Sequence, residues 1–299
     1  MIKYEIIQVQ NILNLLPDKS DGFSAVYTLN PYKGCEHACQ YCYVLSEKYV
    51  PYKKKEEFFY KIQSKTNAAF LLNELLKKIP QDALIMLGSA CDPYQPAERK
   101  YKNTRNILEV IYRYKNPVHI MTKSDLILQD IDILSKISAA SFLAISFSVI
   151  STDEESSLFE PRAPKPSKRF KAMEILSSKG IRCGVAISPL CPYIVKEKTV
   201  KDIILRANLS GAKYVFSDDL RLRDVNKERF FAFIKKFYPK LSARYEIIYS
   251  KRVSPPAIFS EKINEMIEKM SADLGMDTTL TGKTLPKIKK IQSELFEEK

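Results

Sequence analysis

Three cysteines lie close together near the amino terminus, and their type and spacing are those of a set of metal ligands. Cys35, Cys39 and Cys42 have the spacing C-x3-C-x2-C within the segment NPYKGCEHACQYCYV. Thiolates are the usual ligands of iron–sulfur clusters. Three of them leave one iron of a four-iron cluster open, which is the coordination that a reactive cluster needs. The spacing therefore predicts a [4Fe-4S] cluster with one free coordination position.

A zinc site is the alternative interpretation of the same loop, with His37 as the fourth ligand. Cys35 and His37 are only two residues apart, which hinders joint chelation, and a second pair of ligands is missing. The other cysteines, Cys91, Cys183 and Cys191, are scattered, so the chain does not read as a disulfide scaffold. The pattern indicates a metal group in a reducing compartment.

The composition is that of a globular protein. Of the 299 residues, 45% are hydrophobic and 28% are charged. No signal peptide and no apolar run of roughly 20 residues is found, so we expect a cytoplasmic protein with no membrane partner. Lys and Arg exceed Asp and Glu by 48 to 35, which gives a formal charge of +13. This excess either favours nucleic acid or another polyanion as a partner, or is a solvated basic surface.

Short β-branched runs alternate with amphipathic helical patterns along the chain, which predicts parallel βαβ units. Buried strands are expected at residues 24–29, 84–88, 118–121, 142–148, 182–187 and 214–217. Helices are expected at residues 67–78, 104–113, 167–178, 200–209 and 227–238. Either an open doubly wound sheet or a partial barrel satisfies this order.

Other segments do not fit this alternation as simply. A seventh strand is expected at residues 245–250, and residues 47–65 suggest an inserted loop or an extended strand beside the cysteine loop. Two helices are expected near the end of the chain, at residues 260–270 and 286–297. The chain is thus divided into an N-terminal extension, a main domain and a C-terminal helical cap, at residues 1–21, 22–254 and 255–299.

Four blocks of the chain resemble one family. The blocks are NPYKGCEHACQYCYV, DPYQPAERKYKNTRNILEVI, NPVHIMTKSDLILQDIDIL and EPRAPKPSKRFKAMEILSSKGI. In this order they are similar to blocks of the radical S-adenosylmethionine (SAM) enzymes related to spore photoproduct lyase, often called DNA repair photolyase-like proteins. The resemblance spans residues 23–220, and it implies an α/β fold of the radical SAM type, a partial (β/α)6 barrel.

The resemblance also implies a cofactor chemistry. Cys35, Cys39 and Cys42 would hold a [4Fe-4S] cluster whose open iron chelates S-adenosylmethionine. One electron, from an external donor such as flavodoxin or ferredoxin, would cleave the sulfonium and release a 5′-deoxyadenosyl radical that takes hydrogen from the substrate. Tyr41, between two of the ligands, is expected near the adenine.

Further cofactor contacts are expected where the strands end, each with a structural alternative. Lys123 follows the third strand and either pairs with the cofactor carboxylate or is a surface lysine in a loop. Ser146 and Ser148 alternate on the fourth strand, and either one of them meets the ribose or both are polar core positions. Arg162 either contacts the cofactor or pairs with Glu160.

Two residues near the cysteine loop are candidates for hydrogen transfer. Cys91 follows the second strand, where the lyase of this family has a cysteine that returns hydrogen to the product radical. The alternative for Cys91 is a buried, inert thiol. Tyr43 is adjacent to the last cluster ligand and is either a relay for the same hydrogen or an ordinary packed aromatic residue.

A polar segment, CDPYQPAE, follows the second strand and contains Asp92, Tyr94, Gln95 and Glu98. Its polar residues and two prolines indicate either a rigid functional loop or turn chemistry alone. Arg169, in the helical pattern after the fourth strand, is expected either near the cofactor or as a charge on the helix surface.

The resemblance together with the basic charge favours a lyase-like radical SAM enzyme that acts on nucleic acid, by repair or modification of a base. Two alternatives stay open. In the first, the same radical chemistry acts on a peptide or a small metabolite. In the second, the protein binds an iron–sulfur cluster without catalysis or transfers electrons, which the blocks beyond the cysteines argue against.

Overall fold

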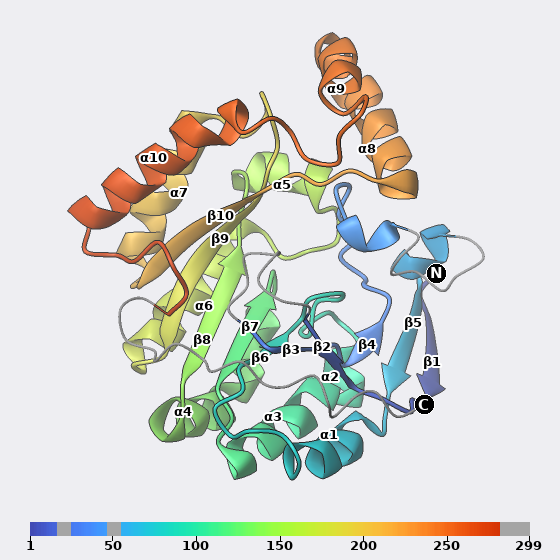
Figure 1. The fold of residues 1–299 in the computed structure, drawn as a ribbon, viewed down its shortest axis with the longest axis vertical. Coiled ribbons are helices and arrows are strands. Elements are labelled where there is room, and N and C mark those ends of the chain that lie inside the picture. Colours follow the sequence, from blue (N-terminus) through green and yellow to red (C-terminus); the bar gives the residue numbers. More distant parts are fainter. Residues whose placement is uncertain (17–24, 47–54, 282–299) are drawn as a thin grey trace.

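The structure is a computed structural model that describes residues 1–16, 25–46 and 55–281. Its larger sheet has the strand order β10-β9-β8-β7-β6-β3-β2, in which β3, β6, β7, β8, β9 and β10 are parallel and follow chain order. The six parallel strands are β3 (Tyr27–Leu29), β6 (Ile85–Leu87), β7 (Val118–Thr122), β8 (Leu143–Ser148), β9 (Arg182–Leu190) and β10 (Tyr214–Asp219). The first and last of these strands do not pair, so the structure is a partial (β/α)6 barrel, as expected (Figure 1).

Helices cover the outer face of this sheet (Figure 1). They are α1 (Ala68–Leu76), α3 (Asn103–Tyr114), α4 (Ile131–Ala140), α6 (Pro166–Ser178) and α7 (Glu197–Leu209). The sequence patterns predicted all of them except α4. Two short helices that the patterns also did not predict, α2 (Glu98–Tyr101) and α5 (Asp153–Phe159), lie in the loops that follow β6 and β8.

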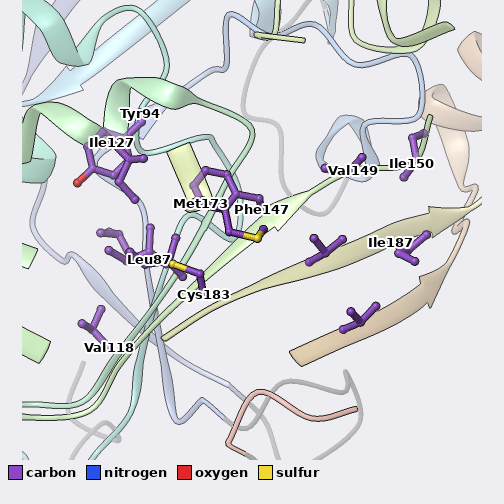
Figure 2. Packing of buried hydrophobic residues seen from close by; sticks show 14 of the residues in the cluster. Leu87, Tyr94, Val118, Ile127, Phe147, Val149, Ile150, Met173, Cys183 and Ile187 are labelled. Atoms are coloured by element: carbon purple, nitrogen blue, oxygen red, sulfur yellow. The ribbon is translucent and has the colours of Figure 1, made fainter. Parts of the chain in front are cut away.

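The core lies between the sheet and these helices. Ile145 and Phe147 of β8 face outward into it, and Met173 of α6 packs there beside Phe147 and Cys183 (Figure 2). All of these side chains are fully buried. Burial of each large apolar side chain stabilises the fold by about 1.5–3 kcal/mol, which fixes the face that each strand turns to the helices. Ser146, between Ile145 and Phe147, therefore points to the inside of the barrel.

A second, three-stranded sheet lies beside the first and leads into the cysteine loop. β1 (Lys3–Ile7) pairs in parallel with β5 (Lys61–Lys65), and β5 pairs antiparallel with β4 (Tyr32–Lys33). The extended strand expected within residues 47–65 is thus confirmed as β5, although residues 47–54 lie outside the described part of the chain. β2 (Leu13–Leu15) forms the antiparallel edge of the larger sheet. The proposed division of the chain at residues 21 and 254 stays a prediction.

The seventh strand expected at residues 245–250 is wrong, because this segment belongs to the helix α9 (Ser242–Ile248). Aromatic and β-branched residues gave the segment YEIIYS a strand-like composition. Tyr245, Ile248 and Tyr249 are nevertheless buried together at helical spacing, and the Tyr245 ring lies 5.7 Å from that of Phe230 on α8. Packing against α8 (Asp224–Phe237) therefore decides in favour of a helix.

The C-terminal helix α10 (Ile258–Asp273) packs against α7 and β10, which confirms the first helix of the expected cap. The second, expected at residues 286–297, lies outside the described residues. Within the described ranges, no helix is both long enough and apolar enough to cross a membrane.

Candidate active site

The cysteine loop begins in close contact with β5. Gly34 has a φ of +89°, and a Cβ atom at this position would lie 2.6 Å from the carbonyl oxygen of Lys61. The N–H of Cys35 donates to the carbonyl of Phe58 at 2.9 Å. Only glycine permits both this backbone conformation and this close approach, so the turn into the loop depends on Gly34.

The polar loop after β6 holds the backbone of the cysteine loop. The side-chain oxygen of Gln95 accepts from the N–H of Glu36 at 2.9 Å, and its Nε2 donates to the carbonyl of Gly34 at 3.1 Å. In return, the Glu36 carboxylate accepts from the N–H of Ala97 at 2.7 Å and from the Tyr4 hydroxyl at 2.9 Å. Gln95 and Glu36 are both buried, so these bonds are shielded from water. Sequence analysis did not find this role of Glu36 and Tyr4.

The three thiols of the loop are shielded from water to different degrees. Cys39 is buried, and Cys35 and Cys42 are half-buried. Burial raises the pKa of all three thiols, that of Cys39 to about 12, whereas the N–H groups of Val44 and Leu45 act in the opposite direction on Cys42. Ligation of a metal group would displace the thiol protons and stabilise the thiolates.

The arrangement fits an iron–sulfur cluster better than a single zinc ion. Across the described ranges, no group of three or more His, Cys, Asp or Glu side chains converges closely enough to hold one metal ion. In a four-iron cluster each thiolate binds a different iron, so the sulfurs need not converge on one point. His37, the expected fourth zinc ligand, instead places Nδ1 at 3.3 Å from the Asp92 carboxylate.

The His37–Asp92 contact ties the cysteine loop to the end of β7. Both side chains are buried, and the contact between them lacks hydrogen-bond geometry. Asp92 also accepts from the Thr122 hydroxyl and from the N–H of Lys123, each at 2.7 Å. Burial alone would raise the pKa of Asp92, but His37 and these donors outweigh it and lower the pKa to about 2. Asp92 is therefore an ionised anchor below the loop.

A buried chain of polar residues begins at Tyr41. Its hydroxyl donates to Glu160, and Glu160 forms an ion pair with Arg169. Arg169 is fully buried and also donates to the carbonyls of Ser148 and Pro164, at 2.7 and 2.8 Å. The interpretation of Arg169 as a helix-surface charge is thus wrong, because its guanidinium neutralises a carboxylate inside the protein.

Lys123 lies at the mouth of the barrel, as its position after β7 predicted. Its Nζ is 5.7 Å from the centre of the Tyr41 ring, and within the described residues no side chain or carbonyl accepts a hydrogen bond from it. Burial lowers the pKa of Lys123, but the nearby Cys39 and Glu160 outweigh burial and raise it. The ammonium group is therefore charged and has donors to spare for an anionic ligand group.

Arg162 does not pair with Glu160, because Glu160 is taken by Arg169. Its guanidinium donates to the carbonyl of Phe59 at 2.8 Å, and its backbone N–H donates to the carbonyl of His37 at 3.3 Å. Arg162 thus lies against the cysteine loop, with an exposed side chain. A contact with the cofactor stays a prediction for this residue.

Ser146 lies deeper in the barrel than the loop. It is fully buried, and its hydroxyl is 2.8 Å from Nε2 of His119 and 2.8 Å from the Tyr214 hydroxyl. Ser148, two residues closer to the mouth, donates to the carbonyl of Ser188 at 3.0 Å. These bonds connect β8 with its neighbours, and the structure brings neither serine into hydrogen-bond contact with the cysteine loop. A ribose contact stays a prediction.

Cys91 lies in a small buried cluster beside the cysteine loop rather than in the main core. Its buried side chain packs with Tyr32 and Ile62, and Cys35 contacts the same small group. The Tyr43 hydroxyl donates to the carbonyl of Ser89, two residues before Cys91, and the Tyr43 side chain is 45% exposed. The structure therefore brings both candidates for hydrogen transfer to the cysteine loop.

The structure thus has a partial barrel with three cysteines in the loop after its first parallel strand. A comparison with protein families shows which family has this arrangement. The model of the Radical SAM superfamily matches residues 29–206, a span that contains the cysteine loop, Cys91 and Lys123. The chain belongs to the radical SAM superfamily. Enzymes of this superfamily use a [4Fe-4S] cluster and SAM and take an electron from an external reductant.

Related sequences extend over nearly the whole chain. An uncharacterized protein of Methanocaldococcus jannaschii is 30% identical over 89% of this chain and 93% of its own length. An uncharacterized protein of Mycobacterium tuberculosis is 26% identical over 91% of this chain and 81% of its own.

Solved structures share the fold. Spore photoproduct lyase complexed with dinucleoside spore photoproduct superposes with a TM-score of 0.68 over 92% of this chain and 81% of the lyase, at 13% identity. Streptococcus suis SuiB bound to precursor peptide SuiA gives a TM-score of 0.52 over 84% of this chain and 48% of SuiB, at 12% identity. At these identities the likeness concerns the fold alone.

Proposed function

We propose that this radical SAM enzyme acts on nucleic acid in the cytoplasm and repairs or modifies a base by hydrogen transfer. The observation that carries the proposal is the position of Cys91, a buried thiol in the small cluster against which Cys35 of the cysteine loop packs. The net charge of +13 and the fold of a lyase that binds a dinucleoside photoproduct support nucleic acid as the substrate.

The chain's own residues bind and orient the cofactors. When bound, the [4Fe-4S] cluster and SAM supply a 5′-deoxyadenosyl radical that takes a hydrogen atom from substrate carbon. Cys35, Cys39 and Cys42 would hold the cluster. Tyr41 would contact the adenine, since its hydrogen bond to Glu160 fixes its ring. Lys123 would bind the carboxylate of SAM through its unshared donors.

Cys91 would complete the reaction as the hydrogen donor. Its weak S–H bond breaks homolytically, the hydrogen atom goes to the substrate carbon, and a thiyl radical remains on the sulfur. Tyr43 would then return a hydrogen atom to Cys91, and the tyrosyl radical would take an electron from the external reductant and a proton from water. The exposure of Tyr43 and its hydrogen bond to Ser89 suit this relay.

The experiment compares Cys91→Ala with the unaltered enzyme after anaerobic reconstitution and reduction. Formation of 5′-deoxyadenosine is measured with SAM alone and with single- and double-stranded oligonucleotides that carry intact or damaged bases. We expect oligonucleotides to stimulate it and their binding to weaken steeply as salt rises, because phosphate contacts release counterions. The Cys91→Ala enzyme should still cleave SAM but yield by-products of a wrongly quenched substrate radical, seen by mass spectrometry.

A peptide substrate is the second candidate, because SuiB bound to its precursor peptide shares the fold. The same assay separates the two candidates. No binding of DNA or RNA at low salt, together with stimulation by a peptide library, would favour the peptide. An identical product from Cys91→Ala would remove Cys91 from the chemistry and leave it a packing residue.

A further inference from the structure

The helix α8 places an arginine next to the cysteine loop, on a different element from the residues discussed above. α8 packs against the short 3₁₀ helix Tyr43–Leu45, which directly follows Cys42 (Figure 1). The guanidinium of Arg229 on α8 stacks on the ring of Phe59, with Cζ 4.6 Å from the ring centre. Phe59 is buried and lies just before β5, next to Phe58, whose carbonyl accepts from the N–H of Cys35. The arginine is therefore held beside the segment that supports the cysteine loop.

Arg229 carries a charge that its surroundings leave largely uncompensated. Its Nε is buried, and within the described residues this atom has no hydrogen-bond acceptor and the guanidinium has no carboxylate at ion-pair distance. Burial lowers the pKa of Arg229, whereas Cys42, Tyr60, Glu56 and Cys39, in decreasing order of effect, act to raise it. An arginine stays protonated in such a site.

The other cations around the loop differ in this respect. Arg169 is neutralised by its ion pair with Glu160. The negative charges of Glu160 and Asp92 act on Lys123 and raise its pKa. Arg162 is exposed, so water and salt screen its charge. Arg229 therefore combines partial burial with a position beside the cysteine loop, and among the described residues no carboxylate lies at ion-pair distance from it, because Glu56 acts on it only from farther away.

We propose that Arg229 raises the reduction potential of the cluster held by Cys35, Cys39 and Cys42. Reduction converts [4Fe-4S]2+ to [4Fe-4S]+ by one electron from a low-potential external donor, and it adds a full negative charge to the site without a proton. A fixed positive charge in a partly dehydrated environment stabilises the reduced state more than the oxidised state. The charge of Arg229 thus makes reduction of the cluster by the external donor more favourable. This role does not depend on the identity of the substrate.

The test measures the reduction potential of the reconstituted cluster by anaerobic redox titration, followed by the paramagnetic signal of the reduced state, without SAM or substrate. Arg229→Gln and Arg229→Met remove the charge, whereas Arg229→Lys keeps it. Arg206→Gln is the matched control, since Arg206 stacks on Phe170 at 5.2 Å but lies on α7 and loses the same net charge. Iron content and thermal unfolding are measured for every variant.

We expect both neutral variants to lower the potential by about 59 mV, which corresponds to a tenfold loss in the one-electron reduction equilibrium. Arg229→Lys should retain most of the wild-type potential, and Arg206→Gln should leave it unchanged. An unaltered potential in a neutral variant with full iron content would overturn the proposal. The same unaltered potential with weaker oligonucleotide binding would overturn it too, and would identify Arg229 as a substrate contact. The Met variant, which keeps apolar packing against the Phe59 ring, allows the measurement if the Gln variant fails to fold.

Discussion

Replacing Gln95 by methionine removes both hydrogen bonds that the loop after β6 makes to the backbone of the cysteine loop, and it preserves the length of the side chain. The lost partners are the N–H of Glu36, at 2.9 Å, and the carbonyl of Gly34, at 3.1 Å. Gln95 is fully buried, so water cannot replace its amide. Leaving a buried donor or acceptor unsatisfied costs about 1–3 kcal/mol, so the two together should lower the free energy of unfolding by about 2–6 kcal/mol.

This loss falls on the loop that carries the ligands, so Gln95→Met should also retain less iron than the wild type after anaerobic reconstitution. The assays are chemical unfolding of the apo-protein and iron analysis of the reconstituted protein. Gln81→Met is the matched control, because Gln81 donates only one hydrogen bond, at 3.1 Å to the carbonyl of Tyr114, at the surface. Wild-type stability and iron content in Gln95→Met would refute the conclusion that this side chain holds the cysteine loop.

Three further predictions concern other parts of the molecule. Replacing Cys35, Cys39 and Cys42 by alanine should abolish binding of about four irons and four sulfides; stoichiometric zinc without iron in the anaerobically prepared wild type would contradict the cluster. Lys123→Ala should weaken SAM binding by about 1–3 kcal/mol at unchanged iron content, as calorimetry would show, and unchanged affinity would exclude the carboxylate contact. His119 is held neutral because burial lowers its pKa from 6.5 to about 3. Its contribution to stability is therefore full above pH 6.5 and is lost at about 1.4 kcal/mol per pH unit as the pH falls from 6.5 towards 3. Unfolding titrations of the wild type and His119→Phe should diverge in this range, and parallel curves would speak against a neutral His119.

Several parts of the site could be found from sequence because their signals are local. The three cysteines occupy one loop, so their spacing alone indicates joint ligation. Lys123 and Cys91 follow buried strands, and the carboxyl ends of parallel strands meet at one edge of the sheet. Their closeness to the cysteine loop follows from the βαβ order, and the structure bears it out.

Partners chosen over long distances in the chain could not be found in this way. Arg169 rather than Arg162 pairs with Glu160, since only the fold shows which guanidinium is buried beside that carboxylate. The bond between Glu36 and Gln95 joins residues 59 positions apart. Several polar side chains near the loop could donate or accept such bonds, so the sequence cannot rank the candidates.

The sequence by itself determined the cluster loop and the six parallel strands, because ligand spacing and continuous β-branched runs are properties of short segments. The tertiary structure alone decided that residues 245–248 are helical, since packing of Tyr245 against α8 outweighs a strand-like composition. It also decided that Arg229 stacks on Phe59 beside the cysteine loop, because α8 is brought to the loop only when the barrel has formed. Burial and electrostatic environment are properties of the folded chain, which is why they could not be assigned residue by residue beforehand.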